Sequence, residues 1–194
     1  MLTRIKNKFR VYISGVTAAF HNLGLTPNDV SGIGFLFSIF SAFFYFWHPE
    51  IWFIALATIL LLLSGFFDAL DGAIASKYGE ITKFGGFIDS TLDRVSDAIV
   101  FCGIILGGLT SSIWGLAAIV SSFLVSYTRA RGEGVGVNMA SVGIAERPER
   151  ILLIAAAAFL QLIYSGALEI GIIIVTILSV LTVLQRTVYV AKHT

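Results

Sequence analysis

The chain has 194 residues, of which 57% are hydrophobic and only 13% are charged. A soluble domain normally carries about a quarter charged residues, so this composition argues against a protein surrounded by water alone. The net charge is only +1, and we expect no nucleic-acid partner. A single cysteine, Cys102, excludes an internal disulfide.

The first 24 residues predict an amphipathic helix that lies in the membrane interface. Its apolar residues recur at helical spacing: Leu2, Ile5, Phe9, Ile13, Val16, Phe20 and Leu23. Lys6, Arg10, Ser14 and Thr17 lie between them. A cleaved signal peptide is the alternative, but Ser14 and Thr17 interrupt the apolar region that such a peptide needs.

Six apolar stretches follow, each a candidate membrane span. A spanning helix needs about 20 mostly apolar residues. The candidates are residues 30–47, 51–75, 84–107, 112–131, 149–164 and 168–190. We therefore predict an all-α integral membrane protein with a single domain over residues 1–194 and six transmembrane helices within 30–190.

The positive charges are distributed unevenly along these spans. With six spans, every Lys and Arg lies at the same end of the helices, and the opposite loops contain none. Because cytoplasmic loops are enriched in Lys and Arg, we expect a multi-pass protein of the cell membrane with both termini and both charged loops in the cytoplasm.

Four aspartates are the most informative residues of the chain. Asp68 and Asp71 end the second span three residues apart, and Asp89 and Asp93 begin the third span four residues apart. Each pair shares a helix face, and the short loop between the two spans makes them antiparallel neighbours whose acidic faces can converge.

An unpaired aspartate inside a membrane costs about 2.5–3.5 kcal/mol even on the lenient scale, so four need compensation. All-oxygen ligands suit Mg²⁺ or Mn²⁺, and two such ions could bridge the four carboxylates. The alternative is that they pair with Lys77, Lys83 and Arg94 at the membrane edge. Asp97, one turn further, is interpreted as a hydrogen-bond partner and not as a ligand.

Small residues accompany the aspartates. Gly72 and Ala75 lie near the Asp68–Asp71 face, and Gly85 precedes Asp89 by one turn. Beside carboxylates, they would let a base or a pyrophosphate approach the backbone. Close helix packing is the alternative explanation.

A second group of charged residues lies further along the chain. Arg129 and Arg131 end the fourth span, Arg147 and Arg150 flank Pro148 at the start of the fifth, and Arg186 interrupts the last. Arginines at a helix N-terminus favour anion binding, and a cation inside a span needs a partner or an anionic ligand. They could also be membrane anchors or local Glu–Arg pairs.

The acidic pattern resembles the signature of the CDP-alcohol phosphotransferase family. The match is Asp68-x2-Asp71-Gly72-x2-Ala75-x9-Gly85-x3-Asp89-x3-Asp93, and it departs from the family at Ser76, where an Arg is usual. The resemblance implies a six-helix homodimer with a cytoplasmic polar cavity and two metals, Mg²⁺ or Mn²⁺, on these aspartates, with Asp93 also the general base. It further implies a nucleotide and CDP-lipid site made by Pro27, Asn28, Asp68, Gly72, Ala75, Ser76 and Gly85.

The basic pattern is similar to the branch of that family that makes phosphatidylinositol phosphates. Arg129, Arg147 and Arg186, together with Arg150, would bind the phosphate of a phosphorylated polyol acceptor. The implied reaction moves a phosphatidyl or archaetidyl group from a CDP-lipid to inositol 1-phosphate and releases CMP. Membrane lipids would surround the donor.

Other functions stay open from the sequence alone. The same chemistry could use glycerol 3-phosphate or serine as the acceptor. An ion or proton transporter also carries intramembrane acids, but near the midplane and in repeated halves. A scaffold would leave the carboxylates unexplained.

Overall fold

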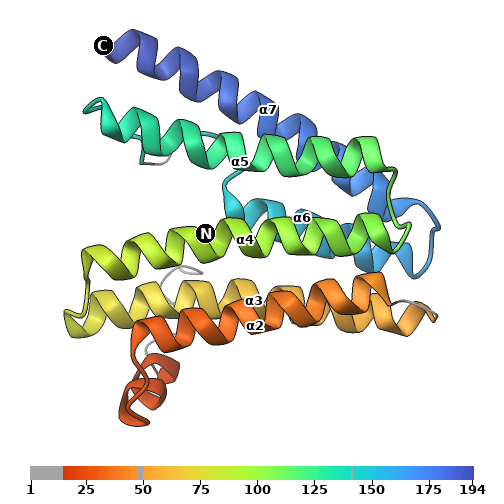
Figure 1. The fold of residues 1–194 in the computed structure, drawn as a ribbon, viewed down its shortest axis with the longest axis horizontal. Coiled ribbons are helices and arrows are strands. Elements are labelled where there is room, and N and C mark those ends of the chain that lie inside the picture. Colours follow the sequence, from red (N-terminus) through yellow and green to blue (C-terminus); the bar gives the residue numbers. More distant parts are fainter. Residues whose placement is uncertain (1–14, 48–49, 141) are drawn as a thin grey trace, which may run out of the picture.

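The computed structural model describes residues 15–47, 50–140 and 142–194, and within these ranges all regular secondary structure is helical (Figure 1). Residues 15–22 form a helix, which is the described part of the expected interfacial segment; residues 1–14 lie outside the described residues. Six longer helices follow: α2 (Pro27–Phe46), α3 (Ile51–Tyr78), α4 (Lys83–Leu106), α5 (Ser112–Gly134), α6 (Arg147–Gln161) and α7 (Ala167–His193). The all-α prediction is confirmed for the described ranges.

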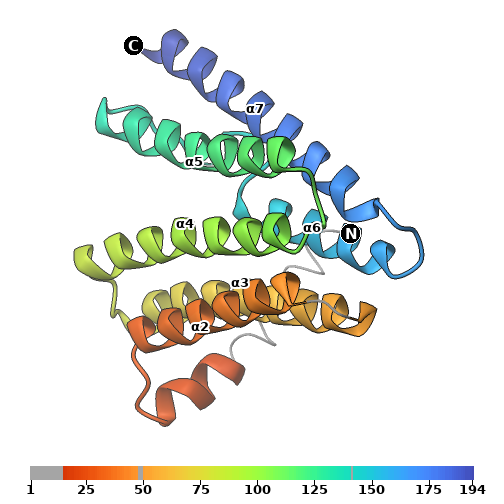
Figure 2. The ribbon, with the colours of Figure 1, turned by 45° about the vertical axis from the view of Figure 1, so that its right-hand side comes forward.

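The six helices run alternately in opposite directions, as Figures 1 and 2 both show. The α3–α4 turn, the end of α5 and the C-terminus therefore lie at one end of the bundle, which we call the charged end. The opposite connections, around residues 47–50, 107–111 and 162–166, contain no Lys or Arg. The uneven charge distribution seen in the sequence thus corresponds to two different ends of the molecule.

The helices begin and end within a few residues of the predicted spans, but not all of them have the character of a span. Among the described residues, α2, α3, α5 and α7 are long and apolar enough to cross a membrane. Helix α4 carries several charges, and α6 has only 15 residues, short of the roughly 20 that a span needs. Four candidate spans, rather than six, follow from length and composition.

Capping residues set the helix boundaries at the charged end. Thr26 and Asp29 form a reciprocal capping box at the start of α2, with Pro27 in the first turn. Helix α3 ends at Gly79, whose φ of 71° is left-handed and favours glycine. Thr82 then caps α4 by accepting a hydrogen bond from the Gly85 amide at 2.9 Å. These caps place both aspartate pairs within a few turns of one tight connection.

Helix α2 packs along both α3 and α4, whereas α3 and α4 have no extensive contact with each other. Its close approaches need small residues: a Cβ on Gly34 would lie 3.1 Å from Phe67 Cβ, and one on Gly103 would lie 2.3 Å from the Ala42 carbonyl oxygen. The expected antiparallel pair is therefore present, but α2 holds it. Space is left between α3 and α4 at the charged end.

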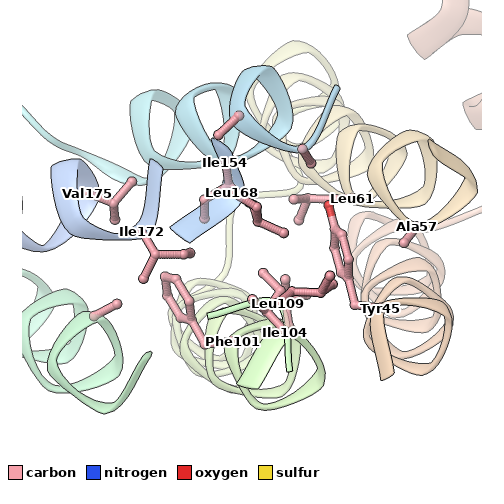
Figure 3. Close-up of a cluster of buried hydrophobic side chains, with 14 of the residues drawn as sticks. Tyr45, Ala57, Leu61, Phe101, Ile104, Leu109, Ile154, Leu168, Ile172 and Val175 are labelled. Atoms are coloured by element: carbon pink, nitrogen blue, oxygen red, sulfur yellow. The ribbon is translucent and has the colours of Figure 1, made fainter. Parts of the chain in front are cut away.

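The main hydrophobic core lies at the opposite end, where all six helices from α2 to α7 contribute buried side chains (Figure 3). It includes Tyr45, Ile54, Ile104, Leu168 and Ile172, each buried and each close in sequence to a connection without Lys or Arg. Helices α2 to α4 form one group and α5 to α7 another, joined by the α3–α6 and α4–α5 contacts. The bundle is thus packed at one end and polar at the other.

Candidate functional site

The predicted aspartates converge at the charged end of α3 and α4, and we call Asp68, Asp71, Asp89 and Asp93 the acid group. One carboxylate oxygen each of Asp68, Asp71 and Asp89 lies within 4.8 Å of the other two. Asp71 is only 5% exposed. Buried carboxylates this close together need a positive charge, and three hard oxygen donors are the set that Mg²⁺ and Mn²⁺ prefer. The residues present therefore fit a divalent metal.

A serine that the sequence did not single out supports this group. Ser31, on α2 and almost fully buried, donates a hydrogen bond to Asp71 Oδ2. In the sequence, only its position one turn after Pro27, which is among the residues predicted to bind nucleotide, indicated that Ser31 lies near the site. The contact shows how α2, which packs on both acidic helices, also orients one of their carboxylates.

Asp93 lies beside two arginines. Its Oδ1 lies 2.6 Å from Arg147 Nη1, and its Oδ2 lies 3.7 Å from Arg94 Nη1. The same Arg147 nitrogen lies 2.7 Å from Asp68 Oδ1. Of the cations suggested as ion-pair partners, Arg94 contacts the group, whereas Lys77 Nζ lies 3.2 Å from Thr17 Oγ1 on the N-terminal helix. Arg147 is thus the main basic neighbour of the acid group.

A cavity of about 590 Å³ opens beside Asp71 and Asp89, and we call it the donor pocket. Most residues predicted to bind nucleotide line it: Pro27, Asn28, Gly72, Ala75 and Gly85. A Cβ on Gly85 would lie 3.2 Å from Asn28 Oδ1, so the missing side chain keeps this wall close-fitting. Two further predicted residues are not on its wall, because Asp68 lines the neighbouring cavities and Ser76 is an exposed residue of α3.

A second cavity, of about 270 Å³, lies on the other side of the acid group, and we call it the basic pocket. All four arginines predicted to bind an acceptor phosphate line it: Arg129, Arg147, Arg150 and Arg186. Arg94 lines it as well, which the sequence did not suggest. The four come from α5, α6 and α7, so residues up to 57 positions apart meet at one cavity.

The buried arginines of this pocket are held by oxygen atoms. Arg186 is 2% exposed; its Nε donates to the Val142 carbonyl at 2.7 Å, and its Nη2 lies 3.1 Å from Glu146 Oε1. A Cβ on Gly143 would lie 3.5 Å from the same Nε. The segment before α6 therefore wraps around Arg186, and Glu146, not singled out from the sequence, supplies its carboxylate.

Asp97 connects the two helix groups. Its Oδ1 lies 3.2 Å from Arg147 Nε, and its Oδ2 lies 2.6 Å from Arg150 Nη2. Arg129 is more exposed and pairs with Glu133 at 3.1 Å, one turn along α5. The expectation that Asp97 acts as a hydrogen-bond partner agrees with these contacts.

A small third cavity, lined by the acid group, shares lining residues with both pockets. That cavity shares Ser31, Asp71 and Asp89 with the donor pocket, and Asp68, Asp93 and Arg147 with the basic pocket. The order along the site is thus a glycine-lined pocket without Lys or Arg, a set of carboxylates, and a set of arginines. Such an arrangement can hold a metal-bound diphosphate beside a second, anionic molecule.

Comparison with known proteins agrees with this chemistry. The model of the CDP-alcohol phosphatidyltransferase family matches residues 25–188. The archaetidylinositol phosphate synthase of Pyrococcus horikoshii is 41% identical over 192 residues, which are 99% of this chain and 97% of that protein. The phosphatidylinositol phosphate synthase of Streptomyces avermitilis is 34% identical over 183 residues, 88% of this chain and 74% of that protein.

Solved structures show the same fold. The phosphatidylinositol phosphate synthase of Mycobacterium tuberculosis with CDP-DAG bound has a TM-score of 0.79 and 29% identity, and the match covers 92% of each chain. A crystal structure of that synthase with manganese and citrate also has a TM-score of 0.79, at 30% identity, over 92% of this chain and 88% of that one.

Proposed function

The chain belongs to the CDP-alcohol phosphatidyltransferase family, and we propose that it transfers the phosphatidyl or archaetidyl group of a CDP-lipid to inositol 1-phosphate, releasing CMP. It is a membrane transferase of phospholipid synthesis. One observation carries the choice of acceptor: four arginines from three helices line a single cavity that also reaches Asp68 and Asp93. An acceptor that bears a phosphate gives these cations an anion to bind.

Divalent metal is the cofactor that the acid group fits. Asp68, Asp71 and Asp89 would hold it, with Asp93 beside them, and two ions of Mg²⁺ or Mn²⁺ are our proposal for the full set. When bound, the metal neutralises the diphosphate of the donor and stabilises the charge that develops on the leaving group. Manganese in a related solved structure supports a divalent cation.

The donor pocket would take the cytidine diphosphate. Gly72, Ala75 and Gly85 keep side chains out of a cavity that ends at Asp71 and Asp89, while Pro27 and Asn28 form its other wall. The lipid tails would remain in the bilayer. We place Ser76 at the exposed edge of this site, and no other residue is assigned to the role of the usual family arginine.

The bond changes follow from the order of the pockets. The acceptor hydroxyl attacks the phosphorus that carries the lipid, the bond from this phosphorus to the CMP oxygen breaks, and CMP leaves with that electron pair. Asp93 accepts the hydroxyl proton: of the two acid-group carboxylates that line the basic pocket, Asp68 and Asp93, it is the one outside the close set of Asp68, Asp71 and Asp89. Arg129, Arg147, Arg150 and Arg186 hold the acceptor phosphate during this step.

The membrane arrangement is proposed as a single domain of six spans, including α4 and α6 in addition to the four apolar helices. The alternation of helix direction supports it, since an even number of spans leaves the charged loops and the C-terminus at one end. By the positive-inside rule this end, with its active site and both termini, faces the cytoplasm. We propose a homodimer, as the family resemblance implies.

Glycerol 3-phosphate and serine are the two other acceptors that the same reaction could use. Glycerol 3-phosphate also carries a phosphate and would use the same arginines, whereas serine carries none. Inositol 1-phosphate is favoured because synthases of inositol phosphate lipids match the chain over nearly its whole length. Membership of the family replaces the transporter and scaffold alternatives.

The test is CMP release by the purified protein with Mg²⁺ and a CDP-lipid, with each acceptor supplied in turn and the lipid product identified by mass spectrometry. We expect release with inositol 1-phosphate and formation of the corresponding phosphoinositide. Release with glycerol 3-phosphate alone would contradict the acceptor assignment. No release with any acceptor, from a folded protein, would contradict the proposed reaction.

A further inference from the structure

Helix α4 carries three aspartates, Asp89, Asp93 and Asp97. Asp97 is the one outside the acid group, and it makes two ion pairs. It contacts Arg147 at 3.2 Å and Arg150 at 2.6 Å, and its own side chain is 13% exposed. Both arginines belong to the first turn of α6, three residues apart, so they share a face. One carboxylate of the first helix group therefore holds two cations of the second.

The two arginines depend on this carboxylate to different degrees. Arg150 is 3% exposed, and Asp97 is the carboxylate it pairs with; its other contact is the Ala145 carbonyl at 3.2 Å. A buried cation without a paired charge is strongly disfavoured. Arg147 has Asp68 and Asp93 as well, on its Nη1, while Asp97 holds its Nε.

Arg147 is thus shared between opposite sides of the site. Its Nη1 contacts Asp68, which also belongs to the three carboxylates that fit a metal, while the basic pocket uses the same guanidinium. Only Nη1 of this guanidinium contacts Asp68 and Asp93, and a guanidinium that turned its other nitrogens toward them as well would occupy more of the oxygens that a metal needs. Asp97 pulls on the Nε side and opposes that movement.

We propose that Asp97 is a positioning residue, which acts through Arg147 to balance that guanidinium between the metal carboxylates and the acceptor pocket. It keeps Asp68 available to divalent metal, and it fixes Arg147 and Arg150 as one rigid pair for the acceptor. The acceptor half of this inference rests on the proposed function, whereas the metal half does not. Partners behind metal ligands commonly change metal affinity by 10- to 100-fold.

The experiment is a double-mutant cycle that combines changes at Asp97 and Arg147 and measures Mn²⁺ affinity. Free Mn²⁺ is measured by EPR on the full-length protein in the absence of CDP-lipid and acceptor. Asp97→Asn should weaken Mn²⁺ binding about tenfold, because Arg147 then pairs only with Asp68 and Asp93. Arg147→Gln should strengthen binding, since it removes a cation from Asp68. In the Asp97→Asn, Arg147→Gln double variant, the effect of the Asp97 change should almost vanish.

The control is Glu149→Gln, which removes one negative charge from an exposed residue of the same turn of α6. We expect its Mn²⁺ affinity to match the wild type. If Asp97→Asn fails to fold, the Asp97→Asn, Arg150→Gln variant removes the buried unpaired cation and should show the same weakening. An equal loss of Mn²⁺ affinity with and without Arg147, or wild-type affinity in the single variant, would overturn the inference.

The kinetics give a second reading. At saturating Mg²⁺, where the weaker metal affinity has no effect, Asp97→Asn should raise the KM for inositol 1-phosphate at least about tenfold while the KM for CDP-lipid changes by less than about twofold, because the arginine pair lines the basic pocket and not the donor pocket. Equal rises in both constants would overturn the acceptor half. A wild-type protein that does not use inositol 1-phosphate would contradict the proposed acceptor and leave the Mn²⁺ cycle to decide the role of Asp97.

Discussion

The acid group and the basic pocket lie next to each other, but their charges are balanced in different ways. Each buried arginine of the basic pocket already has a carboxylate: Arg186 has Glu146, and Arg150 has Asp97. Asp71 and Asp89 instead have each other, Asp68 and the Ser31 hydroxyl as neighbours. The buried arginines of the basic pocket are therefore neutralised by the protein itself, and so are Asp68 and Asp93 through Arg147, whereas Asp71 and Asp89 depend on a cation from outside.

This difference predicts where each substitution is felt. Changes in the acid group should act on metal dependence and on the chemical step, and changes in the basic pocket should act on the acceptor. Arg147 belongs to both regions and is the residue through which they can influence each other.

The largest effect is expected at the boundary between the two regions. Asp93→Asn removes the proposed proton acceptor, and kcat should fall about 10³-fold, the size typical of general base catalysis. The measurement is the rate of CMP release with both substrates saturating. A normal gel-filtration profile serves as the folding control, and a kcat within about tenfold of the wild type would remove Asp93 from this role.

Arg186→Gln should weaken acceptor binding in the basic pocket and leave the binding of CDP-lipid unchanged. Loss of a charged hydrogen-bonding group costs about 1.5–3 kcal/mol, so the KM for inositol 1-phosphate should rise about 10- to 100-fold while that for CDP-lipid stays nearly constant. Arg131→Gln is the matched control, because Arg131 is an exposed residue of α5 outside the pocket lining. Parallel rises in both KM values would point to a structural role for Arg186.

Gly85→Ala should affect the donor pocket and spare the acceptor. The added Cβ would lie 2.8 Å from Thr82 Oγ1 and 3.2 Å from Asn28 Oδ1, so the pocket wall must shift. If the overpacking cost of about 1–3 kcal/mol falls on donor binding, the KM for CDP-lipid should rise about 5- to 150-fold. Gly32→Ala, where nothing lies within 4 Å of the new Cβ, should leave this KM unchanged; similar losses in both variants would contradict the prediction.

The smallest effect is expected at Ser31. Ser31→Ala removes the hydrogen bond to Asp71, worth about 1 kcal/mol, so the Mg²⁺ concentration for half-maximal activity should rise about fivefold. Ser41→Ala removes a comparable bond, from Ser41 to the Ala57 carbonyl at 2.8 Å, in the core end of α2. That control should lower stability without changing the Mg²⁺ requirement. An identical Mg²⁺ dependence in Ser31→Ala and the wild type would show that Asp71 does not need Ser31.

The positions of the helices and most of the residues that line the two pockets could be predicted from the sequence. The individual contacts between side chains inside the pockets could not. The aspartates could be found because their spacing on two adjacent helices makes them converge through local geometry alone. The four arginines could be grouped only by resemblance, because α5, α6 and α7 bring them together through tertiary packing. Ser31 was missed because an isolated serine has no periodic signature. Arg94 was predicted only as an ion-pair partner of the aspartates, and the places of Arg94 and Glu146 in the basic pocket were missed because one charge among other charges has no such signature either.

The number of spans shows a different limit. Apolar length identifies α2, α3, α5 and α7. Helix α4 has charged residues that line the site, and α6 has only 15 residues and carries Arg147 and Arg150 in its first turn. Both helices depart from the pattern of a span where they contribute to the site. Length and composition therefore identify four candidate spans among the described residues, and the arrangement with six spans stays a proposal.

The central claim is that the acid group activates a lipid donor while the basic pocket selects an acceptor by its phosphate. The most direct measurement compares CMP release by the wild-type protein with inositol 1-phosphate and with free inositol, at equal Mg²⁺ and CDP-lipid. We predict release with the phosphorylated acceptor and almost none with free inositol. Equal rates with the two acceptors would show that the arginines do not select the phosphate, and would contradict this account.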